Sequence, residues 1–421
     1  MVFKNGTSLL AAASMVALMA SSQAAAQTIV DWVYIEANPD AVAVMESIAR
    51  AYEAEHPDVE IRMQYLENEA FKAKLPTMLQ SGDAPDIFYS WGGGVLAEQV
   101  RGGVLRSITE KVDAEWQSWI APSALSAFTV DDDIYGVPVA TSLVGFFYNK
   151  AMFEQAGVDA EAIQTWSDLM SAVDALKAAG LTPLTVGGQE GWPQHFYFSY
   201  LSARIAGHEK LHAALRGEGE GFTDPAFVEA FTKLKELADK EPFQDGWLAS
   251  GASQSQGNFG NGKAAMMLQG NWARSGQANN SEDGKGLGDD LGWMPFPAVE
   301  GGHEGGLETL GGINGWIFDK NASDEAVDFM RFYSQPENLT EMARAGVIAP
   351  MPGIANQLDD PWQAMVATAI EGSAHHQNFF NVMFAEEVNR ELLDIVTGVM
   401  TGDLTPEDGA QALQDAWEFS Q

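Results

Sequence analysis

The sequence predicts an α/β fold of two lobes, in which each lobe has a mainly parallel sheet flanked by helices and hinge segments cross between the lobes. Three observations support this prediction. At 421 residues the chain is too long for one comfortable hydrophobic core. Its composition, 46% hydrophobic and 10% aromatic, is typical of a well-packed globular protein. Strand patterns also alternate with amphipathic helix patterns, which is the order of βαβ units.

The first 26 residues have the pattern of a secretory signal peptide. Lys4 precedes an apolar run from Leu9 to Ala20, and small residues end at Ala26. No later segment approaches the roughly 18 apolar residues of a membrane-spanning helix. The sequence has no cysteine to form a disulfide or to carry a lipid. We therefore expect residues 1–26 to be removed and the protein to work in a bacterial periplasm.

The charge of the chain disfavours two classes of partner. There are 23 Lys and Arg residues against 59 Asp and Glu residues, a net charge of −36. Such an acidic surface repels phosphate backbones and anionic lipid, so we expect neither nucleic acid nor a membrane surface as a partner. We expect a monomer.

The first lobe is predicted to begin with a βαβαβ unit. Three strands are expected, at residues 29–34, 59–65 and 86–89. Asn38 caps the helix after the first strand, and Pro39 is its first residue. A second helix is expected over residues 71–80. Strands separated by helices in this way pair in parallel.

The second lobe is predicted to follow an acidic hairpin over residues 129–137 and a first crossing near residue 140. A strand over 144–148 begins this lobe, and another is expected over 184–186. Thr165 and Asp168 have the spacing of a capping box, and Asp224 before Pro225 begins a further helix.

The chain is predicted to return to the first lobe through the apolar segment 291–297, after a polar surface loop over 273–290. A strand over 313–318 and a helix capped by Ser323 complete the first lobe, and the pattern after Pro352 is helical. The predicted N-lobe therefore covers residues 27–140 and 294–348, and the predicted C-lobe covers residues 141–293 and 349–421.

Several tryptophans or polar residues come directly after a predicted strand and beside glycine. These are Trp91, Trp192, Trp272 and Asn314. Trp91 follows a buried strand, and the carboxyl ends of such strands bind ligands in open α/β sheets. A flat indole packs against the C–H face of a pyranose, while nearby amides and carboxylates bind its hydroxyls. The pattern favours a neutral sugar as ligand, although ordinary packing tryptophans are the alternative.

A rival hypothesis is a secreted zinc hydrolase. His208-Glu209-Lys210-Leu211-His212 matches H-E-x-x-H, in which two histidines one turn apart bind zinc and the glutamate activates water. The flanking glycines and the solvated run that follows argue against it. His375 and His376 form a weaker metal candidate, because adjacent side chains point in different directions.

Clustered carboxylates allow a glycosidase in principle. Asp83 with Asp86, and Asp131 to Asp133, are the candidates, but turn formation and capping explain them more simply. The chain has no nucleophile elbow, dinucleotide fingerprint or phosphate-binding loop. We therefore expect no catalytic residue, no metal and no cofactor.

Several motifs resemble the extracellular solute-binding proteins of ABC sugar importers, the family that includes maltose-binding protein. The motifs are Gly82-Asp83-Ala84-Pro85-Asp86-Ile87, Tyr135-Gly136-Val137-Pro138, Phe147-Tyr148-Asn149-Lys150, Asn261-Gly262-Lys263-Ala264-Ala265-Met266, Gly270-Asn271-Trp272 and Ala326-Val327-Asp328-Phe329-Met330-Arg331-Phe332. Their order and spacing cover nearly all of the chain after the signal. The resemblance implies two lobes that close on a carbohydrate and deliver it to a membrane permease, without breaking a bond.

The resemblance also implies the ligand-binding residues. Trp272 would stack on the sugar from the second lobe, and Trp91 would face it from the first. The full predicted set is Glu36, Asn38, Trp91, Ser142, Glu190, Trp192, Trp272, Asn314 and His376. Asn38 has a second role as helix cap. A polyol or an anionic sugar derivative remains an alternative ligand, and an anion would need a Lys or Arg in the site.

Overall fold

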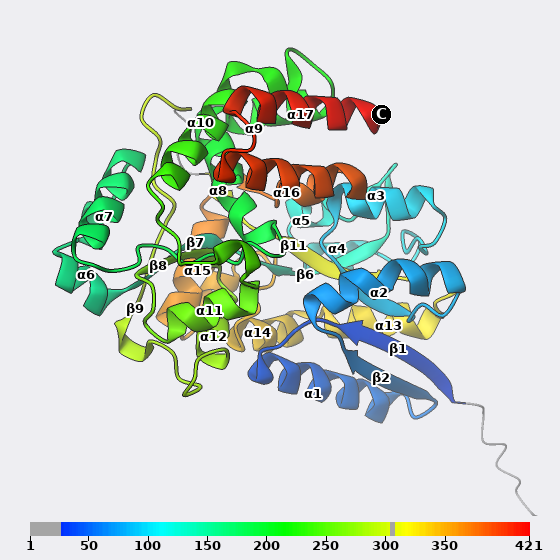
Figure 1. Cartoon of the computed structure of the whole chain (residues 1–421). Coiled ribbons are helices and arrows are strands. Elements are labelled where there is room, and N and C mark those ends of the chain that lie inside the picture. Colours follow the sequence, from blue (N-terminus) through cyan, green and yellow to red (C-terminus); the bar gives the residue numbers. More distant parts are fainter. Residues whose placement is uncertain (1–26, 304–307) are drawn as a thin grey trace, which may run out of the picture.

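The computed structural model describes residues 27–303 and 308–421, so the predicted signal peptide lies outside the described residues. Two sheets with separate hydrophobic cores form two lobes (Figure 1). The prediction of a two-lobed α/β fold is confirmed. No helix in the described ranges is long and apolar enough to cross a membrane.

The N-lobe sheet has the strand order β2-β1-β3-β11-β6. Its first half is the predicted βαβαβ unit, with β1 (Thr28–Tyr34), α1 (Pro39–Glu55), β2 (Val59–Tyr65), α2 (Asn68–Ser81) and β3 (Ile87–Ser90). Strand β1 pairs in parallel with both β2 and β3. The Asn38 side chain accepts a hydrogen bond from the Asp40 amide, which confirms the predicted cap of α1.

Two further strands complete this sheet, and the one in the middle is antiparallel to both of its neighbours. They are β6 (Gly136–Thr141) and β11 (Ile313–Phe318), and β11 lies between β3 and β6. The acidic turn predicted before β6 is a hairpin of β4 (Thr129–Val130) and β5 (Asp133–Ile134). Besides α1 and α2, the helices of this lobe are α3 (Gly93–Arg101), α4 (Ala114–Ser118), α5 (Pro122–Ser126), α13 (Asp324–Tyr333), α14 (Pro336–Arg344) and α15 (Pro361–Glu371).

The C-lobe sheet differs from the parallel sheet that was expected. Strand β7 (Val144–Asn149) pairs antiparallel with both β8 (Met266–Gly270) and β9 (Leu291–Met294). The strand predicted over 184–186 is reduced to Leu184, which makes single parallel bridges to Met266 and Phe243. The alternation of apolar residues identified the buried strands, but it does not contain the direction in which strands pair.

Nine helices among the described residues surround this sheet, and α8, α10, α16 and α17 form the layer at the top of Figure 1. They are α6 (Lys150–Ala156), α7 (Trp166–Ala178), α8 (Trp192–Ile205), α9 (Gly207–Leu215), α10 (Pro225–Asp239), α11 (Ala252–Gly260), α12 (Ala273–Asn279), α16 (Glu386–Thr401) and α17 (Pro406–Phe419). The capping box of Thr165 and Asp168 begins α7, as predicted. The polar loop predicted over 273–290 begins with α12 instead, because small residues there pack against α11.

The packing of two segments differs from the predicted lobe boundaries. Met294 and Phe296 belong to the C-lobe core, so the segment 291–297 stays in that lobe, where residues 291–294 form the edge strand β9. Ile354 and Val366 belong to the N-lobe core, although the sequence placed them in the C-lobe. Apolar, proline-rich composition does not show which of two cores a segment joins.

We propose that the chain crosses between the lobes three times, at the points where consecutive core residues change cluster. The three pairs are Leu143 and Val144, Leu310 and Ile313, and Ala367 and Phe379. The second and third crossings run side by side, because β10 (Thr309–Leu310) pairs in parallel with β12 (His376–Gln377).

The glycines at the start of α3 allow the two lobes to touch closely. A Cβ atom on Gly94 would lie 2.5 Å from the backbone carbonyl carbon of Phe384, and one on Gly93 would lie 2.3 Å from the Val382 carbonyl oxygen. Phe384 and Val382 belong to the C-lobe core. The glycine run therefore makes room for the opposite lobe.

Replacing Gly94 with alanine is expected to destabilise the protein by about 1–3 kcal/mol, because the added methyl group meets backbone atoms that must shift. Urea unfolding monitored by circular dichroism measures this. Gly102→Ala at the end of the same helix is the control, since a Cβ atom there has no neighbour closer than 3.4 Å. Equal stability of the two variants would contradict the proposed role.

Candidate ligand-binding site

Four aromatic side chains of the C-lobe form a cluster at the boundary between the lobes. Trp192 begins α8 and Trp272 follows β8, and their ring centroids are 6.4 Å apart. Phe196 lies 5.6 Å from Trp192 and 6.4 Å from Trp272. Phe379, just after β12, lies 6.1 Å from Trp272. The sequence analysis missed Phe196, although its spacing of four residues from Trp192 indicates the same helix face.

Trp91 is the aromatic residue that the N-lobe contributes. It follows β3, as the sequence predicted, and it packs against the cores of both lobes. Its ring centroid lies 6.0 Å from that of Phe71 on α2 and 5.2 Å from that of Tyr89. Trp91 therefore lies where the carboxyl end of β3 meets the C-lobe.

An ion pair on α2 connects Trp91 with the C-lobe cluster. The Lys72 ammonium lies 5.4 Å from the Trp91 ring centroid and 6.0 Å from the Trp192 centroid. Glu69 Oε1 accepts hydrogen bonds from Lys72 Nζ at 3.1 Å and from Trp192 Nε1 at 3.2 Å. Tryptophans from opposite lobes thus share one cation. Neither charged residue was predicted, because a Glu-Lys pair three residues apart is typical of any solvated helix.

Glu190 approaches the same region from the C-lobe. Its carboxylate accepts a hydrogen bond from the Ala252 amide at 2.9 Å. Burial raises the pKa of Glu190, and the carboxylates of Glu69 and Glu67 on the opposite lobe raise it further. Closing the lobes therefore brings like charges together around Lys72.

Glu36 and Asn38 lie in the loop after β1 and bond to each other. Glu36 Oε1 accepts from the Asn38 amide at 2.7 Å, and burial raises the pKa of Glu36. The Asn38 side chain caps α1 and also donates to the Ala345 carbonyl oxygen at 2.7 Å. Both ends of its amide are thus used within the N-lobe, which gives Asn38 a structural role.

The other predicted residues lie at the crossings. Ser142 joins two of them, because its Oγ accepts from the Gly312 amide at 2.7 Å while its own amide donates to the Gly312 carbonyl oxygen at 2.9 Å. His376 Nδ1 lies 2.8 Å from Thr309 Oγ1, and burial lowers the pKa of His376 to about 4. Asn314 is buried, and its Oδ1 has no hydrogen-bond partner among the described residues. Ser142 and His376 thus bond to residues of the crossings, whereas, within the described ranges, the Asn314 side-chain oxygen does not.

The histidines of the H-E-x-x-H stretch contact other side chains of the C-lobe. Helix α9 does place His208 and His212 one turn apart. However, His208 Nδ1 lies 2.9 Å from Glu308 Oε1, and the His212 ring packs edge-on against His375. Across residues 27–303 and 308–421, no group of three or more His, Asp or Glu side chains is arranged to hold a metal ion.

The carboxylates considered for a glycosidase bond to backbone amides or lie in a turn. Asp86 accepts a hydrogen bond from the Asp31 amide at 2.9 Å. Asp131 and Asp132 occupy the turn between β4 and β5 with φ of 50° and 69°, a region that Asp tolerates better than most residues.

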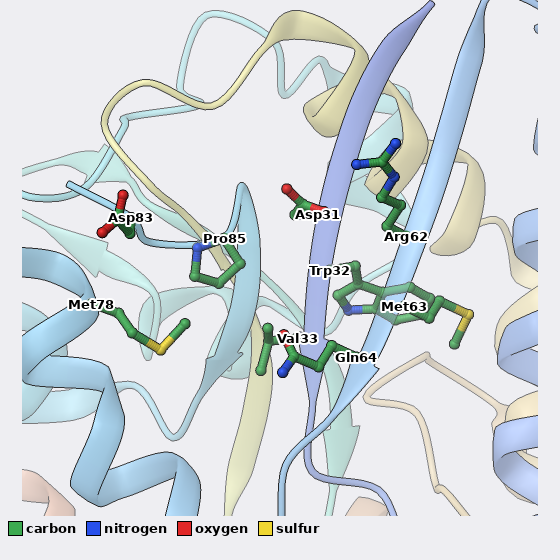
Figure 2. A pocket seen from close by; sticks show the side chains of 9 residues that line it. All are labelled: Asp31, Trp32, Val33, Arg62, Met63, Gln64, Met78, Asp83 and Pro85. Carbon is green, nitrogen blue, oxygen red and sulfur yellow. The ribbon is translucent and has the colours of Figure 1, made fainter. Parts of the chain in front are cut away.

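A hollow of about 240 Å³ lies elsewhere in the N-lobe (Figure 2). Figure 2 shows that strands β1 and β2 and the loop before β3 line it. Its residues are Asp31, Trp32, Val33, Arg62, Met63, Gln64, Met78, Asp83 and Pro85. Because Asp83 and Pro85 precede β3 whereas Trp91 follows it, the hollow is at the opposite end of this strand from the aromatic cluster.

Comparison with known proteins identifies the family. The sequence model of one protein family, the bacterial extracellular solute-binding proteins, matches residues 37–340, which is more than half of the chain. The protein belongs to this family. The family resemblance predicted from the motifs is therefore confirmed, and so is the prediction that the protein is a binding protein and not an enzyme.

Several relatives of this solute-binding protein carry names that specify a ligand. The multiple sugar-binding protein of Streptococcus mutans is 24% identical over 64% of this chain and 63% of its own length. The sn-glycerol-3-phosphate-binding periplasmic protein of Escherichia coli is 25% identical over 77% of this chain and 74% of its own. The chain thus spans less than two thirds of the first of these relatives.

A solved structure shows the same two-lobed fold over almost the whole chain. A chitin oligosaccharide-binding protein superposes with a TM-score of 0.82 at 26% identity, covering 94% of this chain and 99% of that one.

Trp192→Phe is expected to shift the ligand-free protein toward an open form, because it removes the Nε1 donor to Glu69 and keeps an aromatic ring. A hydrogen bond of this kind at a partly exposed site contributes about 1 kcal/mol, or roughly a fivefold change in the closed-to-open ratio. Small-angle X-ray scattering should show a larger radius of gyration. Trp247→Phe, whose indole packs against Phe243 in the C-lobe, is the control. An unchanged radius in both variants would argue against the bond as a link between lobes.

Elemental analysis of the purified protein is expected to find zinc far below one equivalent, because His208 is already paired with Glu308 and no third ligand completes a site among the described residues. One equivalent of zinc that disappears in His212→Gln would instead support the hydrolase hypothesis.

Proposed function

We propose that this protein captures a sugar or oligosaccharide between its two lobes and delivers it to the permease of an ABC importer. The observation that carries the proposal is the meeting of aromatic side chains from both lobes around α2. Lys72 lies within about 6 Å of Trp91 in one lobe and Trp192 in the other. A ligand that stacks on these rings therefore touches both lobes and favours their closure.

The chemistry of this region suits a pyranose. Indole faces of Trp192 and Trp272 offer flat apolar surface to the C–H face of the ring. Glu69, Lys72 and Glu190 offer acceptors and donors for its hydroxyl groups. Relatives named for binding multiple sugars, and a solved relative of similar fold named for chitin oligosaccharides, support this ligand class.

The charges favour a neutral ligand over an anionic one. Lys72 is the cation beside the tryptophans, but Glu69 already pairs with it. Glu67 and Glu69 lie close enough to Glu190 for their negative charges to raise its pKa. A phosphate or uronate group would meet more negative than positive charge here, although the relative from Escherichia coli is named for a phosphoester.

The remaining parts of the proposal concern location and partners. We propose that the signal peptide is cleaved after residue 26 and that the monomeric protein works in the periplasm. The net charge of −36 supports the exclusion of nucleic acid as a partner. The predicted site residues that we retain as ligand contacts are Glu36, Trp91, Glu190, Trp192 and Trp272. We assign Asn38, Ser142, Asn314 and His376 to support of the loop and the hinge.

Trp272→Ala is expected to weaken sugar binding by about 2 kcal/mol or more, roughly thirtyfold, because it removes a stacking surface. A thermal-shift screen of neutral sugars, polyols and anionic sugars identifies the ligand first, since binders raise stability by mass action. Calorimetry then compares the variant with Trp417→Ala, a control whose indole packs on Phe222 in the C-lobe. Unchanged affinity in Trp272→Ala would refute this assignment.

A further inference from the structure

Five of the seven histidines of this chain lie near one another in the C-lobe and at the hinge. They are His208, His212, His303, His375 and His376. The proposed binding of a sugar uses none of them as a ligand contact. Their number is notable in a chain with only 23 Lys and Arg residues, because histidine is the side chain that changes charge near neutral pH.

His208 on α9 and His375 before β12 form the centre of this group. Their rings are stacked, with centroids 4.3 Å apart and an interplanar angle of 17°. His208 Nδ1 also lies 2.9 Å from Glu308 Oε1, and the Glu308 side chain is only 4% exposed. The buried carboxylate can neutralise one protonated imidazole. A second positive charge in the stack would face the first across about 4 Å.

The surrounding charged groups add little further compensation. His303 Nε2 lies 4.0 Å from Glu308 Oε1, so it competes for the same carboxylate. The His212 ring lies 5.8 Å from the His375 ring, edge-on. Arg204 on α8 donates to the Glu308 backbone carbonyl, and Arg216 adds positive charge near His212. Lys210 and Asp224 pair with each other, and His375 Nε2 lies 3.2 Å from Gln377 Oε1.

The segment 375–379 connects this stack directly to the candidate ligand site. The His375 carbonyl oxygen accepts from the Thr309 amide, which ties together the two parallel hinge strands. Three residues later, Asn378 Nδ2 donates to the Trp91 carbonyl oxygen at 3.4 Å. Phe379 packs against Trp272. Residues within four positions of His375 therefore contact Trp91 in one lobe and Trp272 in the other, so a movement of His375 affects both.

We propose that the His208–His375 stack is a pH-responsive anchor of the ligand site, which releases segment 375–379 when both imidazoles are protonated. This inference rests on the proposed function, because it describes how ligand binding by that site is regulated. The protein would hold its ligand near neutral pH and bind it more weakly in acid.

The direction of the effect follows from the titration of His375. Burial, followed by the charge of His208, lowers the pKa of His375. Burial has the largest effect on the pKa of His212 and lowers it, and the charges of His375 and His208 lower it further. In a released segment the His375 imidazole titrates near the ordinary value of about 6.5. Below that pH the released form binds more protons than the anchored form, so the stability of the anchored form is complete above about 6.5 and decreases as the pH falls.

Hydrogen exchange followed by mass spectrometry tests this in the ligand-free protein. Protection of the amides of segment 375–379 is compared at about pH 7.5 and about pH 5.5, after correction for intrinsic exchange, with strand β1 as internal reference. The wild type is expected to lose about tenfold of this protection in acid, the effect of one proton that only the released form binds. In His375→Gln the loss should be absent. His56→Gln, an exposed histidine of the N-lobe, should behave as the wild type.

Equal acid sensitivity in the wild type and in His375→Gln would overturn the proposal. If His375→Gln does not fold, His208→Gln answers the same question from the α9 side, where 36% of the side chain is exposed. Affinity for the sugar identified by screening provides the second measurement, with about tenfold weaker binding expected at about pH 5.5 in the wild type only. If no sugar binds, the proposed function is wrong. The exchange result still shows whether the histidine stack anchors segment 375–379.

Discussion

The two lobes bury their apolar side chains in separate cores, and the rest of the structure depends on this separation. Each core is complete without the other, so the surfaces that meet between them are free to be polar and aromatic. Trp91, Trp192 and Trp272 are partly buried for this reason, since each lies at the edge of a core.

The bonds that join the lobes are individually weak, which suits a protein that must open and close. Glu69 bonds to Trp192 on one side of the boundary, and Arg274 pairs with Asp360 on the other at 2.9 Å. The Glu69, Arg274 and Asp360 side chains are each more than a third exposed, so solvent and salt screen these interactions. The close contact of Gly94 with Phe384 adds shape complementarity without directional bonding. Ligand contacts therefore need to add only a few kcal/mol to favour closure.

The hinge combines structural and functional residues in very short segments. Ser142 bonds Gly312, which joins the first crossing to the second, and β10 pairs with β12, which joins the second to the third. The histidine stack lies at the base of these strands, and Phe379 of the aromatic cluster lies at their other end. One histidine of the motif that resembles a zinc site, His208, stacks on His375 at this hinge.

The sequence alone determined the elements whose signals are local. Asn38, Thr165 and Ser323 cap helices because a side-chain oxygen needs only the amides of the next turn. Trp91 could be placed at the end of β3 for the same reason, and the ordered family motifs predicted the two-lobed fold. Only the tertiary structure decided that β9 joins the C-lobe, that its sheet is antiparallel, and that Lys72 and Phe379 reach the tryptophans. Those facts depend on contacts between residues far apart in the chain, and no local pattern of polarity records which distant surface a side chain will meet.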